Sequence, residues 1–144
     1  DVNMALAAER PIENVMIIVV TSDRGLCGGY NSNLIKLAKQ VIAEKYSAQA
    51  AKGKVQILPI GKKGYENFTK GGAKVINQYW DIFTGLSFDK VQTAAKHAMD
   101  AFANKEVDAV ELIYSEFKNA ATQRFVAEQA RKMLTLYLSP TKMF

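Results

Sequence analysis

An uninterrupted apolar run, Val15–Val20, limits the folds open to this chain more than any other segment. The run is rich in β-branched residues and shows no polar alternation, which is typical of a strand buried on both faces of a parallel sheet. The apolar pattern stops directly after it, in a segment that holds three glycines between Thr21 and Asn31. A buried strand, a glycine-containing turn and a following helix predict the opening of a βαβ unit.

Helices and strands alternate along the rest of the chain at the spacing of crossover connections. We expect helices at residues 32–52, 63–70 and 87–104, and further strands at residues 55–60, 74–79, 109–114 and 123–128. Asn31 and Ser87 are predicted N-caps, and Gly53 a predicted C′ residue. Residues 80–86 and 118–122 are predicted to be a loop and a turn. The alternation predicts one α/β domain, with a mostly parallel sheet of about five strands between helix layers and a final antiparallel strand.

Composition excludes several classes of protein. Hydrophobic residues make up 49% of the chain, enough for a packed core, but no run approaches the roughly 20 apolar residues of a membrane span. The N-terminus shows no signal-peptide pattern. The lone cysteine, Cys27, excludes an internal disulfide and a multi-thiolate zinc site. The lone histidine, His97, falls off the apolar face of its helix and is interpreted as a surface residue. We expect no catalytic residue, metal or cofactor.

The positive charge of the chain is unevenly distributed. Lys and Arg number 19 against 14 Asp and Glu, for a formal charge of +5, and residues 36–74 hold nine lysines against Glu44 and Glu66. Such an excess favours an anionic partner: a nucleic acid, a phosphate ligand or an acidic protein surface. A basic RNA-binding module is therefore one alternative, although its aromatic residues do not form the recognised single-strand signature.

The glycine turn raises a second alternative, a nucleotide- or phosphate-binding enzyme domain. A glycine loop entering a helix presents amides to an anion. Here the spacing is Gly25-x-x-Gly28-Gly29 in place of G-x-G-x-x-G, and the second strand ends without an acidic residue for a ribose hydroxyl. The turn Gly61–Gly64 (GKKG) also lacks the phosphate-loop pattern, and we interpret it as a solvated basic turn.

The segment Thr21–Asn31 (TSDRGLCGGYN), behind the Ile/Val strand, strongly resembles the gamma subunit of F-type ATP synthases. The resemblance continues through Leu34–Lys36, Ile57–Gly64 and Tyr114–Asn119. The resemblance covers nearly the whole chain, from Pro11 to Gln129, and it is to bacterial members of the family.

The resemblance implies a Rossmann-like, three-layer domain without a nucleotide site at residues 11–130, behind the stub of an N-terminal shaft helix at residues 1–10. Residues 131–144 form a tail of unassigned identity, and the family's long terminal helices are missing from the sequence. The implied function is that of a non-catalytic rotor subunit, which couples proton-driven rotation of the c-ring to ATP synthesis in the beta subunits. Implied partners are the alpha, beta and epsilon subunits and the c-ring, but no nucleic acid. The implied location is the cytoplasmic face of the bacterial plasma membrane, with peripheral attachment through the complex only.

The family's Asp-Arg-Gly-Leu-Cys loop lies beside the shaft, where an acidic loop of beta approaches. The resemblance thus implies a candidate contact loop made of Asp23, Arg24, Gly25, Leu26 and Cys27. Arg24 is the natural electrostatic partner of acidic side chains. The alternative, that Asp23 and Arg24 only hold the turn in place, remains open.

Overall fold

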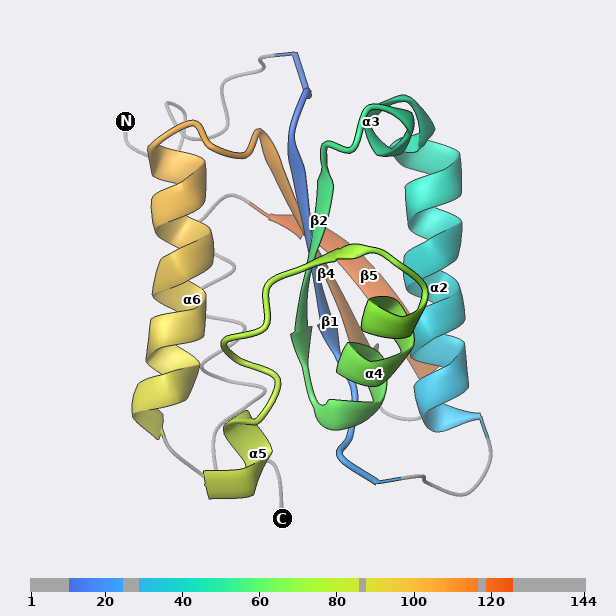
Figure 1. The fold of residues 1–144 in the computed structure, drawn as a ribbon, viewed down its shortest axis with the longest axis vertical. Coiled ribbons are helices and arrows are strands. Elements are labelled where there is room, and N and C mark those ends of the chain that lie inside the picture. The colour runs from blue at the N-terminus through green and yellow to red at the C-terminus, as the bar shows by residue number, and fades with distance from the viewer. Residues whose placement is uncertain (1–10, 25–28, 86–87, 117–118, 126–144) are drawn as a thin grey trace.

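The computed structural model describes residues 11–24, 29–85, 88–116 and 119–125 (Figure 1). Its strands are β1 (Val15–Val20), β2 (Val55–Ile60), β3 (Lys74–Val75), β4 (Ala109–Glu116) and β5 (Asn119–Phe125). Its helices are α2 (Tyr30–Lys45), α3 (Ser47–Ala51), α4 (Lys62–Lys70), α5 (Ile82–Gly85) and α6 (Phe88–Ala103). The strands form one sheet in the order β3-β2-β1-β4-β5. All neighbours are parallel except β4 and β5, which confirms the predicted mostly parallel sheet with an antiparallel end.

The central strand β1 supplies both halves of the core. Met16 and Ile18 pack into a cluster with the alanine stripe of α6, whereas Val15, Ile17 and Val19 pack under α2 and α4. Figure 1 shows α6 on one side of the sheet and α2 and α4 on the other. This arrangement confirms the predicted Rossmann-like, three-layer fold. No helix among the described residues is long and apolar enough to cross a membrane.

The helix predicted for residues 32–52 is in fact two helices, α2 and α3, separated at Tyr46. Tyr46 leaves helical geometry at φ −131° and is 1% exposed, with its ring packed against the sheet. Its hydroxyl donates a hydrogen bond of 2.8 Å to Glu111 of β4. Burial of this ring and hydroxyl therefore accompanies the break in the helix. Gly53 has φ +70° after α3, in agreement with its predicted C′ position.

Three other boundaries differ from the prediction. The strand predicted at residues 74–79 is two residues long, because the chain turns away from the sheet edge and buries Tyr79 against α6. The predicted loop at residues 80–86 contains the short helix α5. The predicted turn at residues 118–122 is wrong from Asn119 onward, where β5 already pairs with β4. The predicted cap Ser87, the helical stub at residues 1–10 and the tail at residues 131–144 lie outside the described residues.

Candidate functional site

The loop after β1 and the turn between β2 and α4 meet at the carboxyl edge of the parallel strands. The Thr21 amide donates to the Ile60 carbonyl at 2.8 Å, which continues the sheet ladder beyond β1. At the next residue of the β1 loop, the Ser22 carbonyl accepts a hydrogen bond from the Lys63 amide at 3.1 Å. The two connections are therefore joined by backbone hydrogen bonds at the edge where doubly wound folds place their ligands.

Three successive residues of the β1 loop cap the N-terminus of α4. The Lys62 amide donates to Asp23 Oδ1 at 2.9 Å, and the Gly64 amide donates to Thr21 Oγ1 at 2.8 Å. Between them lies the bond from Lys63 to the Ser22 carbonyl. Amides of a first helical turn have no partner within their own helix and are a natural anion site. Here the chain itself supplies the oxygen atoms, so these three amides are not open to a phosphate.

Glycine is required where the two connections meet. Gly61 has φ +98° and ψ 140°, and a Cβ added to it would lie 2.1 Å from the Thr21 carbonyl oxygen. A Cβ on Gly64 would lie 2.9 Å from Thr21 Oγ1. Both glycines are buried, whereas Lys62 is exposed. The interpretation of this turn as solvated therefore holds for Lys62 and is wrong for Gly61 and Gly64.

The side chain of Asn31 closes the β1 loop from the first turn of α2. Its Oδ1 accepts the Ser22 amide at 3.0 Å, and its Nδ2 donates to the Arg24 carbonyl at 3.0 Å and to Ser22 Oγ at 2.8 Å. The Ser22 hydroxyl donates to the same Arg24 carbonyl. Asn31 was predicted to be the N-cap of the helix, but Gly29 occupies that position. The tendency of asparagine to bind nearby backbone was recognisable in the sequence, although its partners were not.

The structure separates the roles of the two charged residues in the candidate contact loop. Asp23 is half-buried, and its carboxylate is engaged in capping α4. Arg24 is exposed, and its guanidinium forms no ion pair with any other described residue. Gly25, Leu26 and Cys27 lie outside the described residues. In the described part of the chain, no group of three His, Cys, Asp or Glu side chains is arranged to hold a metal ion.

Two buried polar contacts lie away from this loop. Glu111, fully buried in β4, accepts hydrogen bonds from the hydroxyls of Tyr46 and Thr122, each at 2.8 Å, and pairs with Lys45 at 3.3 Å. His97 is half-buried, with its Nδ1 3.0 Å from the Tyr79 hydroxyl, so its interpretation as a surface residue is only partly right. Burial raises the pKa of Tyr79 above its ordinary value of 10.0. These contacts join α2 and α6 to the rest of the fold.

Comparison with known proteins identifies relatives of this chain. A family model described as ATP synthase matches residues 1–137. The ATP synthase gamma chain of Cytophaga hutchinsonii is 46% identical over 123 residues, which cover 85% of this chain and 42% of that protein. The gamma chain of Chlorobaculum tepidum is 44% identical over 128 residues, covering 89% and 44% respectively. The chain thus spans less than half the length of these curated relatives.

Solved structures resemble the fold. The central stalk and c-ring structure of the Tetrahymena thermophila mitochondrial ATP synthase contains a chain similar to this one, with a TM-score of 0.56 at 20% identity over 91% of this chain and 67% of that one. A chain in a Euglena gracilis mitochondrial ATP synthase structure gives a TM-score of 0.52 at 20% identity, covering 85% and 38%. At this identity the likeness shows a shared fold.

Proposed function

The chain belongs to the ATP synthase family, and on that premise we propose that it is the α/β domain of the gamma subunit of a bacterial F-type ATP synthase. In this role it is part of the central rotor, which couples proton-driven rotation of the c-ring to ATP synthesis in the beta subunits, and is itself non-catalytic. The observation that carries the proposal is the 44–46% identity to bacterial gamma chains over 85–89% of the chain. Residues 1–10 are then the end of the N-terminal shaft helix.

The proposed partners are the alpha, beta and epsilon subunits and the c-ring. Attachment to the membrane is peripheral, through the complex, on the cytoplasmic face of the bacterial plasma membrane. The formal charge of +5 supports contact with acidic surfaces of such partners. Co-purification tests this assignment. A full-length gamma chain containing this domain is expected to bind alpha, beta and epsilon, and failure to bind them would refute the rotor assignment.

Within this function, Arg24 is the proposed contact with an acidic loop of the beta subunit. Its exposure supports this role, as does the clamping of its carbonyl by Asn31 and Ser22, because a fixed backbone limits the positions open to the guanidinium. Asp23 has the other role that the sequence left open, since its carboxylate caps α4 and so holds the turn in place. In this proposal, Asp23 stabilises the conformation of the contact loop and Arg24 contacts the beta subunit.

Charge reversal at Arg24 tests the contact in the assembled complex. Arg24→Glu in full-length gamma should lower ATP-driven proton pumping relative to ATP hydrolysis, because it places a carboxylate opposite an acidic loop. The melting temperature of the isolated chain should stay nearly constant, since exposed substitutions usually change stability by no more than about 0.5 kcal/mol. Lys105→Glu, which reverses the charge of another exposed basic residue, is the matched control. Parallel losses of melting temperature and coupling would assign Arg24 a purely structural role.

The turn that suggested the nucleotide-binding alternative, Gly25–Gly29, lies outside the described residues except for Gly29. At the neighbouring turn between β2 and α4, the amides that could bind an anion are already occupied. The three amides at the start of α4 are bound by Thr21, Ser22 and Asp23. Calorimetric titration of the chain with ATP, ADP and NAD separates the two functions. The rotor proposal predicts no saturable heat from any of them, and a stoichiometric isotherm would favour the enzyme domain.

A further inference from the structure

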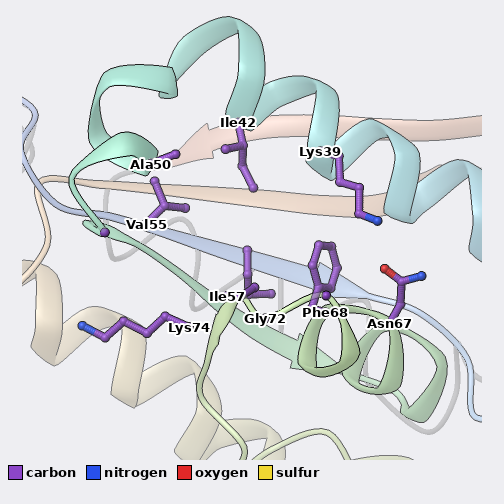
Figure 2. A pocket seen from close by; sticks show the side chains of 12 residues that line it. Lys39, Ile42, Ala50, Val55, Ile57, Asn67, Phe68, Gly72 and Lys74 are labelled. Carbon is purple, nitrogen blue, oxygen red and sulfur yellow. The ribbon is translucent and has the colours of Figure 1, made fainter.

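A groove runs along the β3 edge of the sheet, between α2 and α4 (Figure 2). Its volume is about 410 Å³. Ile42 comes from α2, Val55 and Ile57 from β2, and Phe68 from α4, and together they give the groove an apolar floor. Gly72 lies at the rim, where an added Cβ would meet no atom within 4 Å. The groove therefore combines an apolar floor with an open mouth.

Lysines stand at both ends of this floor. The Lys39 ammonium lies 5.8 Å from the centre of the Phe68 ring, which places a positive charge over the apolar surface. Lys74 lines the groove from β3 and extends away from Lys39 in Figure 2. Neither lysine forms an ion pair with a carboxylate of the described residues. A ligand that fills the groove would meet apolar contacts in the middle and positive charge at each end.

The segment that supplies the lining of the groove is positively charged as well. Seven lysines between residues 36 and 74 have no ion pair within the described part of the chain: Lys36, Lys39, Lys52, Lys54, Lys63, Lys70 and Lys74. The two acidic residues of this segment are both engaged, Glu66 with Lys62 at 3.9 Å and Glu44 with Gln40 at 3.1 Å. Charge complementarity therefore favours an acidic occupant and disfavours a basic one.

The position of the groove beside a free strand edge favours an extended segment. Its wall is lined by Lys39 and Ile42 of α2 and, after the break at Tyr46, by Ala50 of α3. On the opposite side lies β3, the edge strand, with no described strand on its outer side. An extended chain that enters the groove can therefore also lie along the free backbone groups of Lys74 and Val75.

We propose that this groove binds an extended segment of a partner protein in which apolar side chains alternate with aspartate or glutamate. The apolar side chains pack on Phe68 and Ile57, and the carboxylates pair with Lys39 and Lys74. The proposal goes beyond the rotor function, because it is argued from the shape and charge of the groove and requires no subunit of the complex.

Titration of the isotopically labelled chain with a designed peptide tests the proposal by NMR. The probe is an acidic heptapeptide in which valine and phenylalanine alternate with glutamate and aspartate. Saturable shifts are expected at the methyl groups of Ile42, Val55 and Ile57. A peptide with lysine in place of every acidic residue, and one with serine in place of every apolar residue, should each bind at least ten-fold more weakly. Equal binding of either control peptide would overturn the proposal.

Matched variants locate the binding site. Lys39→Glu and Lys74→Glu should each weaken peptide binding at least ten-fold, whereas Lys105→Glu, with the same change in net charge, should leave it within two-fold. Ala50→Phe fills the groove from an exposed helical position without changing charge, and should also abolish binding. Unchanged melting temperatures show that the variants are folded.

Two results would overturn the assignment to this groove and this ligand. Equal weakening by Lys105→Glu would mean that binding depends on net charge alone. Tighter binding of a twelve-nucleotide single-stranded RNA than of the peptide, lost in the same lysine variants, would assign the surface to nucleic acid.

Discussion

Gly61→Ala tests the contact between the two connections at the edge of the sheet. Gly61 has φ +98° and ψ 140°, a backbone conformation that L side chains rarely adopt. The added Cβ would lie 2.1 Å from the Thr21 carbonyl oxygen and 2.6 Å from the carbonyl carbon. No side-chain rotation relieves this overlap, because both atoms belong to the backbone. The β1 loop and the first turn of α4 must therefore move apart.

The structure allows the cost to be estimated. The unfavourable backbone conformation alone costs about 1–3 kcal/mol. Separation of the connections also weakens the hydrogen bonds from Lys63 to Ser22 and from Gly64 to Thr21, each worth about 0.5–1.5 kcal/mol net. With the remaining overlap included, we expect a loss of about 4 kcal/mol or more, which few single substitutions reach.

Gly72→Ala is the matched control. Gly72 also has a positive φ, +81°, but a Cβ added there meets nothing within 4 Å. It should therefore cost only the left-handed backbone penalty, about 1–2 kcal/mol. Urea unfolding of both variants measures the difference, expected to be at least about 2 kcal/mol. If the two free energies of unfolding fall by the same amount, the close approach of Gly61 to Thr21 is refuted.

A second pair of variants keeps the test informative if Gly61→Ala does not fold. A Cβ on Gly64 would meet side-chain atoms of Thr21, Oγ1 at 2.9 Å and Cγ2 at 3.1 Å. Thr21→Ala removes both atoms, so the double variant should lose less than the sum of the single losses, by about 0.5–3 kcal/mol. The same Thr21→Ala change should not rescue Gly61→Ala, because that overlap is with the carbonyl. Rescue in both cases would contradict the geometry.

Three further outcomes are expected. Tyr46→Phe should lower the free energy of unfolding by about 1.5–3 kcal/mol in urea titrations, because the buried carboxylate of Glu111 loses a hydroxyl donor. Burial raises the pKa of Tyr79, so this hydroxyl loses its proton at a lower pH in the unfolded chain than in the folded one. The free energy of unfolding should therefore fall as the pH rises above about 10, and Tyr79→Phe should flatten that part of the alkaline unfolding profile. Asn31→Ala should speed hydrogen exchange at the Ser22 amide, which loses its acceptor, and leave the amide of Ile18 in β1 unchanged.

Elements that depend on apolar pattern alone were predicted with the correct bounds. Val15–Val20 and Val55–Ile60 are strands over their whole predicted length. Val15–Val19 and Ile57–Ile60 are buried, so no polar face had to be assigned and the run itself defines the strand. α4 begins one residue earlier than predicted, at Lys62, and ends before Gly71 as expected.

Elements that depend on distant partners were not predicted. The break at Tyr46 accompanies a hydrogen bond to a residue 65 positions away, and the shortening of β3 accompanies the contact of Tyr79 with His97 in α6. A local pattern carries no information on such pairings, so each segment was assigned the element its own periodicity favours. The strand at Asn119 was missed for the same reason, because its polar sequence becomes a strand by pairing with β4.

The sequence singles out the candidate loop, but it does not show which of its residues bind other parts of the chain. Thr21 and Asp23 bind amides 43 and 39 positions away, and these bonds fix the loop on α4. The structure makes Asp23 and Asn31 holding residues and leaves Arg24 as the exposed charge of the described part of the loop. From the sequence, Asp23 and Arg24 had the same two alternative roles. In the structure, the carboxylate of Asp23 is engaged within the chain, whereas the guanidinium of Arg24 is exposed.

The way in which the chain occupies the carboxyl edge of its own sheet is relevant to the proposed rotor function. In a ligand-binding domain of this fold, the carboxyl edge of the strands holds free amides that meet a phosphate. Here three amides of α4 are bound by Thr21, Ser22 and Asp23, which directly precede Arg24. Through these bonds, the backbone directly before Arg24 is joined to the first turn of α4. A joint of this kind suits a part that transmits torque, and the amides that form it are not open to an anion at this turn.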